Sequence, residues 1–278
     1  MQIFKTQKQL TRYLKEIRKN KTIGFIPTMG ALHSGHISLI HLSKKKCDIT
    51  VCSIFINPTQ FNNSKDFQKY PKNHTQDIPL LQKNECDILY IPDVKDLYIK
   101  SEQTKKFDFG ELTKAMEAEY RPGHFNGVGT IVEKLLNIIN PHKAFFGQKD
   151  LQQLYFVKAL ANTLSIKVDI IACKTIREKN GLAKSSRNTL LSENQKYKAG
   201  IIYQCLNFCK KNQQLGVSAL KKHTIQKINS IKDIKIEYIE FINLENFKKI
   251  TVLDEKNENA ICIAAYLNEV RLIDNIIL

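Results

Sequence analysis

Two histidines near the N-terminus lie in a segment of small residues, Pro27-Thr28-Met29-Gly30-Ala31-Leu32-His33-Ser34-Gly35-His36. The segment follows an apolar run and leads into Ile37 and Ile40, which have the spacing of a buried helix face. A helix N-terminus offers free N–H groups and partial positive charge to a phosphate, and glycine lets the backbone approach a ligand closely. We therefore predict that the segment binds phosphate and that its imidazoles stabilise charge on phosphorus and the leaving oxygen. In the alternative interpretation, both histidines are ordinary loop and cap residues.

A second cluster, Lys184-Ser185-Ser186-Arg187-Asn188, combines hydroxyls with cations. Such groups can hold a triphosphate tail and stabilise departing pyrophosphate, with Ser185 and Arg187 as catalytic candidates. Alone, the cluster is equally typical of a solvated loop. Paired with a His-x-Gly-His helix start, it resembles the signature of the nucleotidyl-transfer superfamily, which includes class I aminoacyl-tRNA synthetases.

A third segment, Phe145-Phe146-Gly147-Gln148-Lys149-Asp150-Leu151-Gln152-Gln153, follows a predicted strand and begins a helix. Gly147 allows close approach of a ligand, Lys149 can contact a phosphate, and a carboxylate after a parallel strand, here Asp150, often binds ribose hydroxyls. Gln148 and Asp150 equally suit a helix start.

Further polar residues follow other predicted strands or precede helices. Asn57 and Gln60 leave a buried strand at the edge where open α/β sheets bind ligands, and both can bind a small polar substrate. Arg121 and His124 can bind an anion or simply begin the long helix that follows. Asp77 can hold a divalent metal ion beside the phosphates, although such a residue is more often solvated.

The elements that must position these residues alternate between strand and helix. Apolar or β-branched runs predict strands at Thr22–Ile26, Ile49–Ile56, Ile88–Ile91, Lys143–Phe146 and Val168–Ala172. Phe125–Asn140 has one apolar stripe and stops before Pro141, as a helix would. Strand–helix alternation predicts an α/β fold, a parallel sheet with helices on both faces.

The pattern changes after about residue 175. Two helical stretches, near Glu193–Lys211 and Ser218–Ser230, precede strand-like runs at Ile234–Ile242, Ala260–Leu267 and Val270–Ile276, with a turn at Asn268-Glu269. The sequence thus predicts one domain over residues 1–175 and a smaller α+β domain over residues 176–278, which carries the Lys184–Arg187 cluster.

Composition excludes several classes of protein. With 278 residues and 42% hydrophobic content, the chain can build a core, and it has no apolar run long enough to cross a bilayer. The polar start at Met1–Lys8 and seven scattered cysteines without a Cys-x-x-Cys pattern favour a reducing cytoplasm. The net charge of +16 suits an anionic partner, but the lysines are spread along the chain as in compositional drift. No nucleic-acid-binding signature is present, so we expect no nucleic-acid and no membrane partner.

Together, in this order, the motifs PTMGALHSGH, SIFINPTQF, RPGHFNGVGTIV, FFGQKDLQQL and GLAKSSRN resemble those of the pantoate–β-alanine ligases (pantothenate synthetases) over nearly the whole chain. The resemblance implies a Rossmann-like domain with a smaller C-terminal lid, usually as a homodimer, binding ATP and Mg²⁺ between the domains. It also implies that pantoate is activated as pantoyl-adenylate with release of pyrophosphate, and that β-alanine then displaces AMP to give pantothenate, a coenzyme A precursor.

The resemblance assigns roles by position. It implies that ATP contacts Met29 through His36, with His36 as the proton donor, and that Gln60 and Gln153 hold pantoate, with Gln60 also holding β-alanine. The remaining nucleotide contacts that it implies are Gly147, Gln148, Lys149, Asp150, Ile176 through its backbone to adenine, Lys184, Ser185, Ser186 and Arg187.

The chain departs from the family pattern at a few positions. Lys184 stands where the family usually has Met or Leu, and we hypothesise that it adds a phosphate contact or points to solvent. Gln148 stands for a common Glu and Ala118 for a usual Gly, while Gln76 beside Asp77 weakens the metal assignment. The alternatives are another nucleotidyl transferase, such as an adenylyltransferase or a small tRNA synthetase, and a nucleic-acid-binding module.

Overall fold

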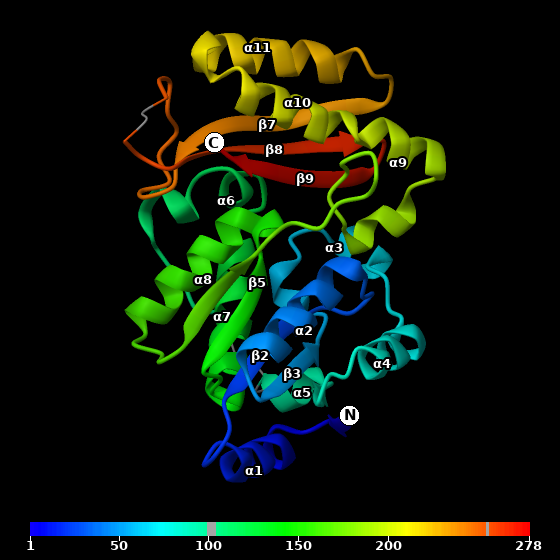
Figure 1. Cartoon of the computed structure of the whole chain (residues 1–278), viewed down its shortest axis with the longest axis vertical. Coiled ribbons are helices and arrows are strands. Elements are labelled where there is room, and N and C mark those ends of the chain that lie inside the picture. The colour runs from blue at the N-terminus through cyan, green and yellow to red at the C-terminus, as the bar shows by residue number, and fades with distance from the viewer. Residues whose placement is uncertain (99–103, 254–255) are drawn as a thin grey trace.

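A six-stranded parallel sheet forms the N-terminal part of the computed structural model, which describes residues 1–98, 104–253 and 256–278 (Figure 1). The strand order is β1-β4-β3-β2-β5-β6, and every neighbouring pair is parallel. The strands are β1 Gln2–Phe4, β2 Ile23–Thr28, β3 Ile49–Ile54, β4 Ile88–Tyr90, β5 Lys143–Gly147 and β6 Asp169–Cys173. The five predicted strands are confirmed, and the short edge strand β1 was not predicted.

Helices cover both faces of this sheet, as predicted. One face packs against α1 (Gln7–Ile17), α7 (His124–Ile139) and α8 (Leu151–Thr163), and the other packs against α2 (Ser34–Lys46) and α4 (His74–Lys83). Alternation along β2 sends Phe25 to the first face and Ile26 to the second. The shorter helices are η1 Pro58–Gln60, α3 Ser64–Lys69, α5 Val94–Leu97, η2 Gly110–Thr113, α6 Glu117–Tyr120 and η3 Gln148–Asp150.

The strand order reverses between β2 and β5. From β2 the chain runs outward to β3 and β4, then returns to place β5 on the other side of β2. Open α/β sheets bind ligands outside the carboxyl ends of the strands at such a switch point. The histidine segment leaves β2 and the Gly147–Asp150 segment leaves β5, so the topology brings these two predicted sites together.

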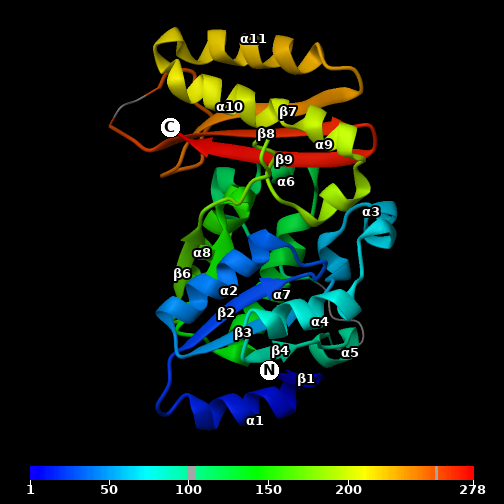
Figure 2. The same cartoon turned by 45° about the vertical axis from the view of Figure 1, so that its right-hand side comes forward.

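The C-terminal part is a three-stranded antiparallel sheet covered by helices (Figure 2). Its elements are η4 Ser186–Leu190, α9 Glu193–Ala199, α10 Ile201–Lys211, η5 Gln213–Leu215, α11 Gly216–Asn229, β7 Ile234–Asn243, β8 Asn259–Leu267 and β9 Val270–Ile277. One face of the sheet, including Phe241 and Ile263, packs with α10 and α11. The opposite face, including Tyr238 and Cys262, joins the core of the N-terminal part.

In this part, one predicted helix is divided into two, and one predicted turn is confirmed. The predicted helix near Glu193–Lys211 is divided at Gly200, where a Cβ would lie only 2.8 Å from the Asn180 side-chain nitrogen. The predicted turn at Asn268-Glu269 is confirmed, because Leu267 pairs with Val270 across it. The predicted domain boundary after residue 175 falls in the segment between β6 and η4, and the division into domains stays a prediction.

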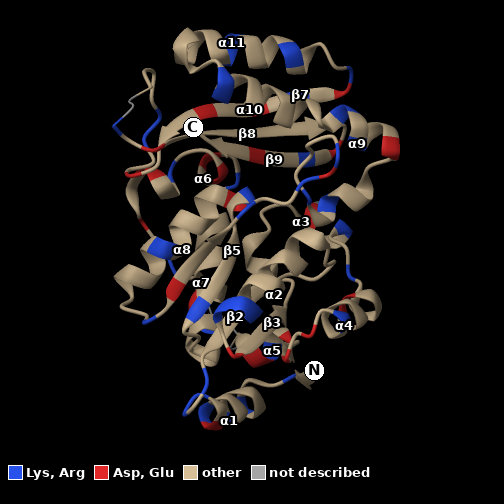
Figure 3. Cartoon of the chain, in the orientation of Figure 1, with Lys and Arg blue, Asp and Glu red and all other residues tan. Residues whose placement is uncertain are grey.

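Surface charge is mixed. In the view of Figure 3, basic and acidic positions are interspersed along the ribbon of both parts of the chain. The seven cysteines are buried free thiols. Among the helices that the structure describes, none is long and apolar enough to span a membrane.

Candidate active site

The loop after β2 is held in a left-handed conformation by groups from elsewhere in the fold. Gly30 has φ +81° and Ala31 has φ +49°. The Asp77 carboxylate, 2% exposed on α4, accepts the N–H groups of Ala31 at 2.9 Å and Leu32 at 2.7 Å, and the Ser186 hydroxyl donates to the Ala31 carbonyl at 2.9 Å. Both Asp77 oxygens are thus engaged by the loop backbone in the ligand-free protein, and the metal assignment of Asp77 stays a prediction.

The two histidines fold back over the start of α2. His33 Nδ1 accepts the Gly35 N–H at 3.1 Å, and His36 Nδ1 accepts the His33 N–H at 3.3 Å. Their ring centroids are 4.1 Å apart. A Cβ on Gly35 would lie 2.7 Å from the His33 ring, so this position must be small. The pair is thus part of the helix cap and also lines the cavity at the switch point.

Both imidazoles are neutral in the ligand-free protein. Burial, together with the cations Lys149 and Lys184, lowers the pKa of His33 to about 4. Burial, His33 and Lys149 lower the pKa of His36 to about 3. Because each Nδ1 accepts a backbone N–H, the single proton of each ring lies on Nε2. Each ring can therefore donate a hydrogen bond from Nε2 to a ligand.

The predicted phosphate cluster lies opposite the histidine loop. Ser186 joins the two loops through Ala31, and Ser185 Oγ accepts the Arg187 N–H at 3.3 Å. The Arg187 guanidinium donates to both oxygens of Asp66, from Nε at 3.3 Å and from Nη2 at 2.8 Å. Asp66 belongs to α3, so in the ligand-free protein a carboxylate engages the guanidinium fork that a phosphate would use.

In the ligand-free protein an acidic side chain engages Lys184, and the two alternatives proposed for Lys184 from the sequence stay predictions. Its ammonium group pairs with Glu178 at 2.6 Å, across a turn closed by the Lys184 N–H donating to the Ile176 carbonyl at 2.9 Å. Both Lys184 and Ile176 line the cavity that the histidines line. A phosphate contact by Lys184 would require the side chain to leave Glu178.

The segment after β5 is held from the C-terminal sheet. Asn275 of β9 donates from Nδ2 to the carbonyls of Gln148 and Lys149, both at 2.8 Å. The Lys149 ammonium lies 3.6 Å from the Asp150 carboxylate. Gly147, Lys149 and Asp150 line the cavity, whereas Gln148 does not. Asn275 therefore fixes the backbone of the predicted ribose and phosphate contacts.

Gln60, the predicted acid-binding residue, is 8% exposed beside the histidine loop. Its side chain donates to Met29 Sδ at 3.0 Å and accepts from Asn57 Nδ2 at 3.3 Å, and its carbonyl bonds to His124 Nδ1 at 2.9 Å. Asn57 also donates to the Gly127 carbonyl at 3.1 Å. Asn57 and His124 thus hold Gln60 in place in the ligand-free protein. Gln153 lines the same cavity from α8.

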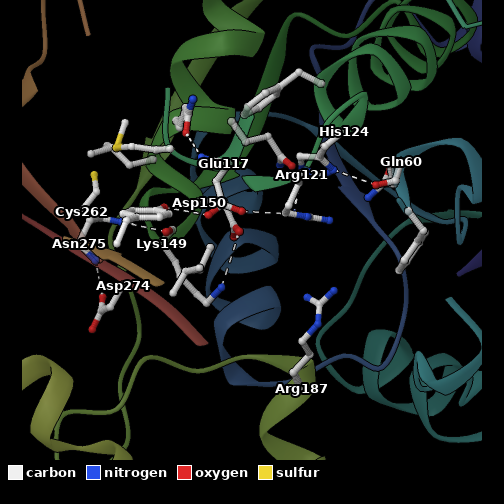
Figure 4. A pocket seen from close by; sticks show the side chains of 18 of the residues that line it. Gln60, Glu117, Arg121, His124, Lys149, Asp150, Arg187, Cys262, Asp274 and Asn275 are labelled. Carbon is white, nitrogen blue, oxygen red and sulfur yellow. Dashed lines mark hydrogen bonds and ion pairs between the residues drawn. The ribbon is translucent and has the colours of Figure 1, made fainter. Parts of the chain in front are cut away.

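One cleft collects most of the predicted site residues. Its central cavity, of about 230 Å³, is lined by Met29, His33, Gly35, His36, Asn57, Gln60, Gly147, Lys149, Asp150, Gln153, Ile176, Lys184, Ser185, Ser186 and Arg187, among others. A side pocket of about 70 Å³ shares Gln60, Lys149 and Arg187 with it and also contacts Arg121 and His124 (Figure 4). A wider cleft of about 930 Å³ continues past Arg187 to the β8–β9 turn. Gly30, Ala31, Leu32, Ser34 and Asp77 do not line these spaces.

Several residues at the site were missed by the sequence analysis. Glu117, Arg271 and Asp66 form ion pairs between elements that lie far apart in the sequence. Asn275 was visible only as part of the run Arg271-Leu272-Ile273-Asp274-Asn275, where polar residues interrupt an apolar strand. Such an interruption is the signal that could have identified it.

Comparison with known families agrees with this geometry. Residues 2–277 match the family model described as pantoate-beta-alanine ligase. A pantothenate synthetase from Cytophaga hutchinsonii is 44% identical over 267 residues, covering 95% of this chain and 94% of that protein. One from Caldicellulosiruptor bescii is 41% identical over 280 residues, covering 100% of this chain and 98% of that protein.

Solved structures show the same fold. The pantothenate synthetase of Thermus thermophilus superposes with a TM-score of 0.92 at 31% identity, covering 99% of each chain. The pantoate-beta-alanine ligase of Francisella tularensis, solved in complex with beta-gamma ATP and beta-alanine, superposes with a TM-score of 0.84 at 36% identity. That match covers 99% of this chain and 97% of the Francisella chain.

Proposed function

Because this chain belongs to the pantoate-beta-alanine ligase family, we propose that it joins pantoate and β-alanine to form pantothenate, cleaving ATP to AMP and pyrophosphate. The observation that carries this proposal is the single cavity at the β2–β5 switch point. Two neutral imidazoles, four cationic side chains and two glutamines line it together. The imidazoles and cations suit the phosphates of a nucleotide, and the glutamines suit a small polar acid, so both substrates can bind side by side.

The first step forms an acyl-adenylate. A pantoate carboxylate oxygen attacks the α-phosphorus of ATP, and the bond from that phosphorus to the bridging oxygen of pyrophosphate breaks. Negative charge grows on the phosphate oxygens, where Nε2–H donors from His33 and His36 and the cation Lys149 stabilise it. Arg187 joins them when it exchanges Asp66 for a phosphate. We assign to the His36 Nε2–H a hydrogen bond to the leaving side, at the position that the family resemblance implies as the proton donor.

The second step forms the amide. The neutral amine of β-alanine attacks the acyl carbon, the bond to the AMP oxygen breaks, and the amine loses a proton to solvent. The adenylate carries AMP, which is a good leaving group, whereas the free carboxylate of pantoate has no good leaving group. Gln60 and Gln153 hold the pantoyl group through both steps, so Gln60 lies beside the incoming amine. Enclosure of the mixed anhydride between the two sheets limits its hydrolysis.

The nucleotide end of the cavity fits adenosine. We place the adenine beside the backbone of Ile176 and the ribose hydroxyls on Asp150, with the phosphates running toward Lys149 and the start of α2. Gly147 borders the cavity and has no atom within 4 Å of a built Cβ, which leaves room for the sugar. Ser185 and Ser186 close the cavity over the phosphates.

The residues do not form a protein cage for Mg²⁺. In the described part of the chain, no three His, Cys, Asp or Glu side chains are placed to hold a metal ion. Protein sites for Mg²⁺ often contribute few carboxylates, because substrate phosphates and water complete the coordination. We therefore propose that Mg²⁺ arrives as the MgATP complex, and we derive no step through a metal held by Asp77. We also propose a cytoplasmic homodimer that binds no nucleic acid.

Product analysis tests this function and separates it from its nearest alternative. The purified protein is incubated with MgATP, pantoate and β-alanine, and then with each substrate omitted in turn. We expect equimolar AMP and pantothenate only in the complete mixture. ATP consumption without free AMP would indicate an adenylyltransferase, and an absence of pantothenate would overturn the proposal.

A further inference from the structure

A buried polar network connects the C-terminal sheet to the predicted acid-binding residue. It centres on Glu117, which begins α6 and is 7% exposed. The Glu117 carboxylate accepts both terminal nitrogens of Arg271 on β9, at 2.8 and 2.7 Å. It also accepts the hydroxyl of Tyr238 on β7 at 2.8 Å. Two strands of the second sheet thus bind one carboxylate of the first part.

From Glu117 the network continues toward the cavity (Figure 4). Arg121 lies one helical turn later, with Nη1 3.4 Å from Glu117 Oε2 and 3.1 Å from His124 Nε2. The last link is the bond of 2.9 Å between His124 Nδ1 and the Gln60 carbonyl. The path therefore runs Arg271, Glu117, Arg121, His124 and Gln60 without a gap.

Each link in this path has one consistent direction. A guanidinium has donors but no acceptor, so His124 Nε2 must accept from Arg121. Nδ1 then carries the imidazole proton and donates it to the Gln60 carbonyl. Burial and the neighbouring Arg121 lower the pKa of His124 to about 3, so the ring is neutral, as this arrangement needs.

The receiving end is rigid. A Cβ on Gly127 of α7 would lie 2.3 Å from the Thr59 carbonyl oxygen and 2.6 Å from the Gln60 nitrogen. The short helix η1 therefore rests directly on the backbone of α7. Gln60 cannot shift without disturbing both this contact and its bond to His124.

We infer that Glu117, Arg271 and His124 are positioning residues for Gln60, through which docking of the C-terminal sheet sets the geometry of acid binding. This inference rests on the proposed function, in which Gln60 binds pantoate. A network that served only to hold the two parts together would alter stability and the binding of both substrates alike. A positioning network alters the KM for the acid and leaves the KM for ATP nearly unchanged.

The test compares variants in an exchange assay, in which pantoate drives labelled pyrophosphate into ATP. Loss of a hydrogen bond that orients Gln60 should raise the KM for pantoate by about 10-fold in Glu117→Gln and in His124→Leu, with the KM for ATP changed less than about 2-fold. His124→Asn should restore most of the loss, because its amide can donate where Nδ1–H did. The control is Lys221→Gln on α11. It breaks an ion pair of 2.7 Å with Glu240 on β7, and neither residue belongs to the path from Arg271 to Gln60.

The double variant Glu117→Gln/His124→Leu provides a further criterion. Residues of one network are non-additive, so the double variant should raise the KM for pantoate by much less than the product of the single effects. Equal changes in both KM values, or multiplying single effects, would overturn the inference. If Glu117→Gln fails to fold, the contrast between His124→Leu and His124→Asn decides alone. No exchange by the unmodified protein would overturn the proposed function together with this inference, whereas exchange with unaffected variants would overturn the inference only.

Discussion

The carboxylate of Asp77 offers a sharp test of how the phosphate-binding loop is built. In Asp77→Asn the side chain keeps its shape but can accept only one of the two loop N–H groups, and its amide nitrogen faces the other. The variant therefore loses a charge-assisted hydrogen bond and leaves one buried N–H of Ala31 or Leu32 unpaired. Each such loss costs on the order of 1–3 kcal/mol, and we take about 2 kcal/mol for the loop.

That loss should appear chiefly in ATP binding. Ala31 has φ +49°, a region that costs a non-glycine residue about 1 kcal/mol, so the freed loop will relax. ATP must then restore the loop conformation, and about 2 kcal/mol corresponds to an affinity roughly 30-fold weaker. Isothermal titration of ATP in the absence of pantoate measures this change. Gln82→Ala, an exposed position on the same helix, is the control and should leave the affinity unchanged.

The same titration separates positioning from metal binding. If Asp77 holds only the loop, the affinity of the variant for MgATP stays low however much Mg²⁺ is added. Recovery of the affinity at high Mg²⁺ would show that Asp77 is a metal ligand. If Asp77→Asn binds MgATP as tightly as the unmodified protein at all Mg²⁺ concentrations, the role of Asp77 in the loop is refuted.

Three other perturbations test single features of the site. Asp66→Asn should tighten ATP binding about 5-fold, because a partly exposed pair worth about 1 kcal/mol no longer competes for Arg187; weaker binding would contradict this. The lowered pKa values of His33, His36 and His124 mean that, as the pH falls from their unfolded value of 6.5 toward 4, the unfolded chain takes up protons that the folded protein does not. The free energy of unfolding from urea titrations should therefore fall on acidification through this window, by about 1.4 kcal/mol per pH unit for each histidine, and a constant free energy would refute the neutral assignment. His36→Ala should slow adenylate formation by at least about 100-fold with the ATP dissociation constant changed only a few-fold, as measured by single-turnover quench, and an unchanged rate would remove His36 from the chemistry.

Much of the fold and of the candidate site could be predicted from local patterns in the sequence. The strands were predictable because buried parallel strands are apolar runs, and α7 because its apolar stripe ends at Pro141. The histidine segment, the Lys184–Arg187 cluster and the Gly147–Asp150 segment were predictable because each combines functional groups with glycine or a helix start. The three-residue strand β1 lacked such a pattern, since Ile3 is 42% exposed at the sheet edge.

The partners of the site residues were not predictable, because they come from distant parts of the chain. Arg187 meets Asp66 across 121 residues, and Arg271 meets Glu117 across 154. The bonds from Asp77 to the loop were not predictable either, because an acidic residue gives no local sign of the backbone that it will bind. Contacts of this kind depend on how the two sheets pack, which no single motif encodes.

Pyrophosphate exchange tests the central claim most directly. The protein is incubated with MgATP, labelled pyrophosphate and pantoate, without β-alanine. We predict label in ATP only when pantoate is present, because a reversible pantoyl-adenylate forms, followed by AMP release when β-alanine is added. A folded protein that binds ATP but shows no pantoate-dependent exchange would contradict the claim that this cavity activates pantoate as its adenylate.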